Sequence, residues 1–178
     1  MKRSVPLSQL LGFAISSFLG TLLHFLYEWS NESPLAALIS GVNESTWEHM
    51  KLLFFPTFAF AIVQSFFFKD REDFWCVKLR GIITGIVLIP LIFYTYNGVI
   101  GVSPAWLNIA IFFISALIEY AYETLLFNKN TTKGCNGKLA FFVLCAVAAL
   151  FMVFTFFTPE LAIFKDPVTG TYGNRVGG

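Results

Sequence analysis

The two histidines of the chain, His24 and His49, are the side chains best suited to metal or acid–base chemistry, and glutamates lie near both in the sequence. His24 and Glu28 are four residues apart, so they share one face of a helix. Imidazole and carboxylate groups together suit a divalent transition metal, and bound Zn or Fe would activate water. The expected metal ligands are His24, His49, Glu28 and Glu44, and the expected catalytic carboxylates are Glu28, Glu44 and Glu48.

Two other interpretations use the same residues. A hydrogen-bonded network in which Glu28 pairs with Lys51 would have only a structural role. Alternatively, two histidines on different helices could hold a haem b as its axial ligands. Each histidine lies about five residues inside the end of its apolar segment, which is a depth of roughly 7–8 Å in a helix. The sequence leaves the metal, haem and structural interpretations open.

A second set of ionisable residues lies in apolar segments near the opposite membrane face. Glu119 and Glu123 are one helical turn apart, and Arg80 is expected at a similar depth in the preceding segment. A charge at the centre of a spanning helix costs about 2.5–3.5 kcal/mol on insertion scales, so these groups should meet one another or a guest. We expect Arg80 to bridge one or both carboxylates.

Polar residues also recur along one face of the segment that carries Glu119. They follow the spacing i, i+7, i+11 and i+14, so they would form a stripe from one membrane face towards the other. Together with the histidines, such a stripe would suit a proton relay or a solute path. The expected pathway residues are Asn43, Asn97, Asn108, Ser115, Glu119, Tyr122, Glu123 and Arg80.

These residues have to be positioned by helices that cross a membrane. Hydrophobic residues make up 56% of the 178 residues and charged residues only 13%, whereas a soluble domain carries about a quarter charged residues. Segments of about 20 apolar residues predict an all-α integral membrane bundle of about five transmembrane helices, in a single domain over 1–178. The expected spans are 9–29, 44–68, 77–98, 104–127 and 138–158, with an outer loop at 30–43 and an outer tail at 159–178.

The basic residues predict how this bundle is oriented. Nine of the 12 Lys and Arg residues fall on the side of the N-terminus, and basic residues favour the cytoplasmic side. We therefore expect a cytoplasmic N-terminus and an outside C-terminus in a multi-pass protein of the cell membrane, of the bacterial cytoplasmic type. Membrane lipid is the expected partner, and no basic tract indicates nucleic acid. A protein partner or a homo-oligomer stays open.

Three shorter features complete the predictions. The apolar run 34–39 is too short to cross a bilayer and favours a short interfacial or re-entrant helix. The segment 165–173 is rich in turn-forming residues and is either an ordered cap or a flexible end. The three cysteines form no CxxC pair, so neither a disulfide framework nor a thiolate zinc site is indicated. We expect Cys76, Cys135 and Cys145 to be packing residues.

Two stretches carry a resemblance to a known family. The stretch 42–56, VNESTWEHMKLLFFP, and the stretch 166–173, DPVTGTYG, resemble an uncharacterised family of small polytopic membrane proteins from Firmicutes. The resemblance would cover most of the chain. It implies a polytopic fold and a location in the cell membrane, and it implies no activity.

Three functions are compatible with these observations. The first is a metal-dependent membrane enzyme whose site opens to the outer face. The second is a transporter of a small solute or ion, or a substrate-binding subunit, that uses the polar stripe. The third is a non-catalytic scaffold held together by buried salt bridges.

Overall fold

The computed structural model describes residues 4–101, 104–129, 132 and 134–173, and the described residues are almost entirely helical. The all-α prediction is confirmed. The elements are α1 (Ser4–Trp29), α2 (Pro34–Ala37), α3 (Thr46–Ser65), α4 (Phe74–Ile100), α5 (Ala105–Lys129), α6 (Gly137–Phe156) and the short 3-10 helix η1 (Ala162–Phe164). An isolated antiparallel bridge between Lys165 and Tyr172 is the one β contact within the described residues.

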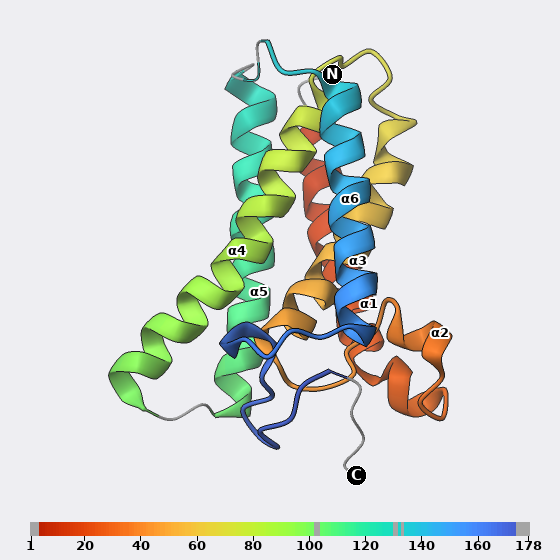
Figure 1. The fold of residues 1–178 in the computed structure, drawn as a ribbon. Helices are drawn as coiled ribbons and strands as arrows, with labels where there is room; N and C mark the ends of the chain where they lie inside the picture. The colour runs from red at the N-terminus through yellow and green to blue at the C-terminus, as the bar shows by residue number, and fades with distance from the viewer. Residues whose placement is uncertain (1–3, 102–103, 130–131, 133, 174–178) are drawn as a thin grey trace.

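The long helices α1, α3, α4, α5 and α6 run side by side, each opposite in direction to the one before it (Figure 1). At one end lie the starts of α1, α4 and α6 and the segment 66–73 (Figure 1); we call this the disulfide end. At the other end lie α2, the start of α3 and the segment 157–173, and we call this the tail end. Sites near opposite ends are therefore separated by the length of the bundle.

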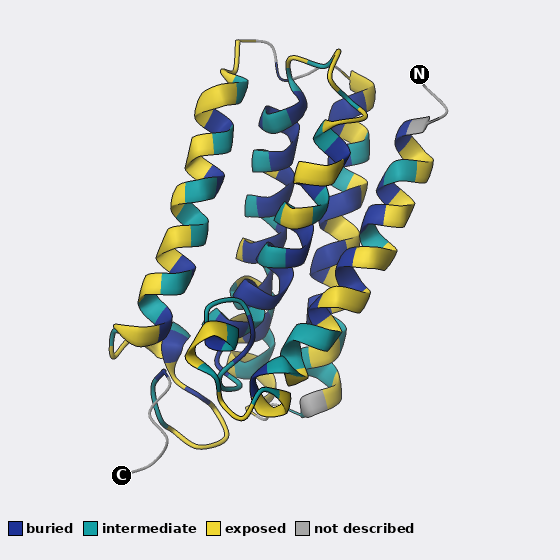
Figure 2. Ribbon diagram, turned by 90° about the vertical axis from the view of Figure 1, so that its right-hand side faces the viewer, coloured by how far each residue is buried: buried dark blue, intermediate teal, exposed yellow. Residues whose placement is uncertain are grey.

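Four of the helices are long and apolar enough to cross a membrane, namely α1, α4, α5 and α6 over most of their lengths. Their outer faces carry large apolar side chains, such as Phe18 at 65% and Phe142 at 66% exposure. Exposed residues follow the outside of the helices and buried ones the inside (Figure 2). Because several buried side chains are polar or charged, this arrangement indicates a membrane protein with a partly polar interior.

The helix α3 is not among those four, although the sequence predicts a span at 44–68. Its hydropathy is lowered by polar residues such as Glu48, Lys51 and Gln64, all of them buried. It packs against α1, α4, α5 and α6 and so occupies the middle of the bundle. A helix surrounded by other helices does not need an apolar surface for lipid, which explains why its composition differs.

Local signals place the helix boundaries. Ser45 caps α3 by accepting a hydrogen bond from the backbone N–H of Glu48 (3.3 Å), so the helix begins at Thr46. Asn136 caps α6 by accepting from the N–H groups of Lys138 (3.0 Å) and Leu139 (3.2 Å). Gly101 ends α4 in the left-handed conformation with φ of 76°. The short helix expected at 34–39 is present as α2, which begins with a proline.

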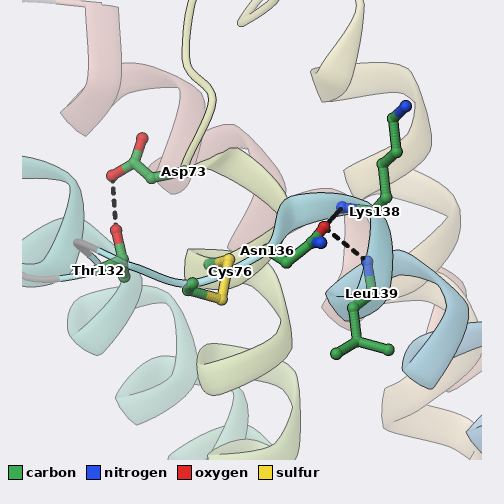
Figure 3. The surroundings of a disulfide bond; sticks show 7 residues. Asp73, Cys76, Thr132, Asn136, Lys138 and Leu139 are labelled. Carbon is green, nitrogen blue, oxygen red and sulfur yellow. Dashed lines mark hydrogen bonds between the residues drawn. A yellow bond between two sulfur atoms is a disulfide. The ribbon is translucent and has the colours of Figure 1, made fainter.

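Cys76 and Cys135 form a disulfide, with Cα atoms 6.2 Å apart, although the two residues are 59 positions apart in the chain. This contradicts the expectation that all three cysteines are packing residues. The bond ties the first turn of α4 to the segment just before α6 (Figure 3). The pairing was missed because only the fold brings the two residues within bonding distance. Cys145 is free and half-buried.

A small polar network lies beside the disulfide. Arg71 donates two hydrogen bonds to Asp73, each 2.9 Å long, and a third to the carbonyl oxygen of Phe127 (3.0 Å). Thr132 donates to Asp73 at 2.8 Å (Figure 3). The hydrogen bonds from Arg71, helped by that from Thr132, hold the pKa of the Asp73 carboxyl below its usual value. The disulfide and this network together fix the loops at the disulfide end.

Candidate functional site

The site at the tail end is formed by His24, Glu44 and His49, which we call the histidine site. One oxygen of Glu44 lies 3.5 Å from Nε2 of His24, and the other lies 3.6 Å from Nε2 of His49. The two imidazole rings are tilted with centroids 5.9 Å apart. The helices α1 and α3 therefore bring both histidines to one carboxylate that belongs to neither helix.

The position of Glu44 follows from where α3 begins. If Glu44 were in the helix, it would lie on a different face from His49, because successive residues turn by about 100°. Because Ser45 is the N-cap, α3 begins only at Thr46, and Glu44 lies in the irregular segment before the helix. The direction of its side chain is therefore not set by the geometry of a helix, and the carboxylate lies between the two imidazoles.

The tautomer of His49 is set by the backbone. Its Nδ1 lies 3.0 Å from the carbonyl oxygen of Ser45, and a carbonyl can only accept, so Nδ1 carries the proton and donates it. In the neutral ring Nε2 then presents a lone pair towards Glu44. With the ring in this neutral state, the site is rich in acceptors, since a carboxylate and a ring nitrogen with a lone pair face each other.

The segment after α6 covers the site and adds another carboxylate. Asp166 is buried at 4% exposure, and its side chain accepts from the N–H groups of Val168 (2.7 Å) and Thr169 (3.2 Å). It also accepts from the backbone N–H of Glu44 at 3.5 Å. Asn43 donates to the carbonyl oxygen of Gly173 at 3.0 Å. The segment 165–173 is thus an ordered cap, and Asn43 has a structural role in holding it.

Two cavities adjoin the histidine site. The larger, of about 140 Å³, lies between α1, α3 and α5, and both histidines contribute to its wall. The rest of its wall is mainly apolar and is formed by Gly20, Thr21, Phe25, Leu52, Ile109, Phe112 and Phe113. The smaller, of about 10 Å³, touches Glu44, His49 and Asn108, and a space of that size holds roughly one water molecule. Together they provide an apolar chamber beside a polar group.

The structure places the other expected ligands elsewhere. Glu28 is exposed at the end of α1 and does not join the histidines. Glu48 is buried and pairs with Lys51 at 2.5 Å, so the expected pair of Glu28 with Lys51 is wrong. Lys51 also donates to the carbonyl oxygen of Ala37 and to Thr155, both at 2.9 Å. This ion pair connects α3 to α2 and α6. Neither of its residues lines one of the two cavities.

Within the described part of the chain, no group of three or more His, Cys, Asp and Glu side chains is arranged to hold a metal ion. The site is better described as a carboxylate between two imidazoles than as a formed metal centre.

A second polar group lies inside the bundle towards the disulfide end, formed by Lys78, Glu119 and Glu123, which we call the acid–amine cluster. The side chains of Lys78 and Glu123 are at most 1% exposed and pair at 2.6 Å. Glu119 is fully buried one turn away. The expected bridge from Arg80 is wrong: Arg80 is exposed, and Lys78, two residues earlier on α4, faces α5 instead.

The residues of the expected polar stripe have different environments. Ser115 is fully buried, whereas Tyr122 is only partly buried and packs against an apolar cluster at the disulfide end. Asn108 accepts from the hydroxyl of Tyr96 at 3.0 Å. Asn97 is half-buried near the end of α4, and Tyr120, buried and paired with Ser16 at 2.7 Å, points inward in place of Tyr122. The stripe is therefore interrupted between Asn108 and Ser115 by apolar packing of Ile111 and Phe112.

Sequence reasoning missed Lys78, although the sequence carried a signal for it. Lys78, Gly81 and Gly85 recur at helical spacing, so one face of α4 carries a basic side chain followed by two residues without side chains. In the structure Glu123 lies against Gly81 and Glu119 against Gly85, and a Cβ atom at either glycine would collide with the carboxylate. The two glycines are four residues apart, as are Glu119 and Glu123 on α5. This matching spacing indicated that the face of α4 with Lys78 is the one that packs against the carboxylates.

Comparison with known proteins adds a family without an activity. Residues 5–174 match a family described as a family of unknown function (DUF6512). No curated protein and no solved structure matches the chain.

Proposed function

The chain belongs to the family of unknown function DUF6512, and on that premise we propose that it is a membrane protein that binds a small organic cation at the histidine site. The charged head of the ligand lies against Glu44 and the imidazoles, and its apolar body fills the adjoining cavity. The observation that carries this proposal is that one carboxylate faces both imidazoles at a cavity that both histidines line.

The charges of the site favour a positively charged head group. Glu44 and Asp166 are both acidic, and Nε2 of neutral His49 offers a further acceptor. Lys51 lies near the same end of α3, but it forms an ion pair with Glu48 and so does not neutralise Glu44. An ammonium group supplies the donors that such a set of acceptors requires.

The cavity favours an apolar body of about the size of one ring. Its volume is about 140 Å³, and an engineered apolar cavity of about 150 Å³ accommodates benzene. Three of its side chains are Phe25, Phe112 and Phe113, and aromatic faces also attract cations. An aromatic amine such as benzylamine combines both features.

Binding of benzylamine to the purified protein in detergent, measured by calorimetry, tests this proposal. We expect stoichiometric binding that exceeds that of benzyl alcohol, which is neutral, and of benzoate, which Glu44 repels. Glu44→Gln should weaken benzylamine binding about tenfold, because it removes the charge of a charge-assisted hydrogen bond. Glu28→Gln is the matched control and should leave affinity unchanged, because Glu28 lies outside the site.

Zinc provides the opposing arm of the same experiment. A divalent transition metal is the guest that the sequence alone favours, with His24, His49, Glu28 and Glu44 as ligands. Stoichiometric zinc binding that is lost in both Glu44→Gln and Glu28→Gln, without benzylamine binding, would replace the cation proposal with the metal-dependent one. Equal binding of benzylamine and benzoate would also contradict it.

We further propose that the chain crosses the membrane five times, with α3 as the fifth span and the N-terminus in the cytoplasm. With 20 residues, α3 is about 30 Å long, which matches the hydrocarbon core. The basic residues of the disulfide end support the orientation; among the described residues they are Lys69, Arg71, Lys78, Arg80, Lys129 and Lys138. This orientation places Cys76 and Cys135 on the reducing side, and their disulfide is therefore an observation that opposes it.

Thiol counting in cells tests the orientation. Disulfides rarely persist in the cytosol, so we expect acid-quenched cells to yield protein with three maleimide-reactive cysteines. The same protein oxidised after purification should show one, Cys145, because Cys76 and Cys135 are then joined. A count of one in quenched cells would place the disulfide end outside and reverse the proposed orientation.

A further inference from the structure

The acid–amine cluster contains one more negative charge than positive charge. Lys78 projects from α4, and Glu119 and Glu123 project from α5. Lys78 pairs with Glu123 at 2.6 Å. The same amine also lies 5.3 Å from the ring centroid of Tyr120 and 5.9 Å from that of Phe74. One ammonium thus neutralises one carboxylate and leaves Glu119.

Glu119 has no partner for either carboxylate oxygen within the part of the chain that the structure describes. Thr57 on α3 lies next to it, but that hydroxyl donates to the carbonyl oxygen of Leu53 or Phe54, both at 3.0 Å. One hydroxyl proton cannot serve both acceptors. An unpaired carboxylate in a dry interior costs several kcal/mol, so a cation must accompany Glu119.

The surroundings of Glu119 supply further unused polar atoms. Ser115 is fully buried one turn earlier on the same face of α5, and its hydroxyl has no partner in the described structure. The second oxygen of Glu123, Oε1, has no hydrogen-bond partner within the described residues, and the side-chain amide of Gln9 on α1 lies next to Glu123. Buried polar atoms without partners are rare in folded proteins and call for an explanation. Here a hydroxyl, an amide and two carboxylates lie together in the interior of the bundle.

The geometry of α4 makes room for this arrangement. Because Gly81 and Gly85 lack side chains, the carboxylates of Glu123 and Glu119 lie directly against the α4 backbone. Any Cβ atom there would collide with them. Close approach of two helices at small residues is common in membrane proteins, but here the space gained is occupied by charged groups instead of apolar ones.

We propose that Glu119 is the binding site of one exchangeable monovalent cation, a proton or a sodium ion, within the membrane-embedded half of the bundle near the disulfide end. One missing positive charge calls for one monovalent guest. A proton on Glu119 finds an acceptor in the free oxygen of Glu123, and a sodium ion finds oxygen ligands in Glu119, Glu123 and Ser115. The titratable groups around it are Lys78 on α4 and Tyr120 and Glu123 on α5; α3 contributes Thr57 and α1 contributes Gln9.

This site is independent of the histidine site. With α5 ending at Lys129, Glu119 lies ten residues, or roughly 15 Å, from the disulfide end. The histidine site is at the opposite end of the bundle (Figure 1). Failure of amine binding at the histidines would leave the cation site standing, and the reverse also holds.

Infrared spectroscopy of the full chain in a detergent without ester groups tests the proposal, because a protonated carboxyl group then has its own carbonyl stretching band. In sodium-free buffer at neutral pH we expect one such band in the wild type. Glu119→Gln should abolish it, and Glu72→Gln, a change at an exposed glutamate, should retain it. Glu123→Gln should also abolish it, because Lys78 is then available to pair with Glu119.

The sodium arm decides which cation binds. If the band disappears on adding sodium chloride but not choline chloride at constant pH, sodium competes with the proton for Glu119. If sodium has no effect, the proton is the guest. The absence of any Glu119-dependent band in sodium-free buffer would overturn the proposal. In sodium-free buffer, Glu119→Gln supplies a neutral side chain of the shape of a protonated glutamate, so its thermal midpoint should equal or exceed that of the wild type; a lower midpoint there would also count against the proposal.

Discussion

Replacing Lys78 by methionine is expected to lower the free energy of unfolding by about 3–5 kcal/mol, the usual cost of removing one partner of a buried ion pair. The change removes the ammonium that pairs with Glu123 and leaves that carboxylate without its partner. The methionine fills most of the same space, so packing loss is small. Denaturation of the protein in mixed micelles, followed by tryptophan fluorescence, measures the effect.

A second change separates charge from packing. Adding Glu123→Gln to Lys78→Met should recover most of the lost free energy, because the double variant lacks both charges of the Lys78–Glu123 pair. Arg80→Met is the matched control and should change the free energy of unfolding by no more than about 0.5 kcal/mol, since Arg80 is exposed. A large loss in Arg80→Met with none in Lys78→Met would restore the pairing that the sequence alone predicts.

Lys51→Met should be similarly destabilising at the other end of the bundle. Lys51 is fully buried, pairs with Glu48 and donates to Ala37 and Thr155. After its loss, the Glu48 carboxylate keeps the hydrogen bond from the backbone N–H of Val42 at 3.2 Å but has lost its charged partner. We expect the free energy of unfolding to fall by about 3–5 kcal/mol and the segment around α2 to become sensitive to protease.

Three further variants test whether the effect of Lys51→Met comes from the loss of its ion pair. Thr155→Val removes one hydrogen bond to Lys51 and should cost about 1 kcal/mol. Glu48→Gln combined with Lys51→Met should recover stability, since neither charge remains. Lys69→Met, at an exposed lysine, should have little effect. If Lys51→Met unfolds no more easily than Lys69→Met, the pair does not hold α2, α3 and α6 together.

The two buried ion pairs have the same chemical composition but different consequences. Glu48 and Lys51 form a balanced pair whose further contacts are with α2 and α6, so that pair is structural. Lys78 and Glu123 have an unpaired neighbour in Glu119, so their balance depends on a guest. We therefore assign stability to the first pair and cation binding to the second group.

The sequence alone determined the class of the protein and the depth of its polar residues. Apolar length and composition are local properties, so the helical membrane bundle and the short helix at α2 could be predicted from them. The depth of a residue along a helix is also local, because each residue adds about 1.5 Å. For this reason His24 and His49 were expected at the same level, and the structure brings their rings together.

The tertiary structure alone decided which groups meet. The partner of a buried charge depends on helix rotation, where a shift of two residues turns a side chain by about 200°; this is why Lys78, and not Arg80, reaches Glu123. Because α3 starts at Thr46, Glu44 lies outside the helix and its carboxylate reaches the histidines, whereas Glu28 is exposed. The disulfide joins residues 59 positions apart, a proximity that no local pattern contains. Composition gives the environment of each residue, but only packing gives its neighbours.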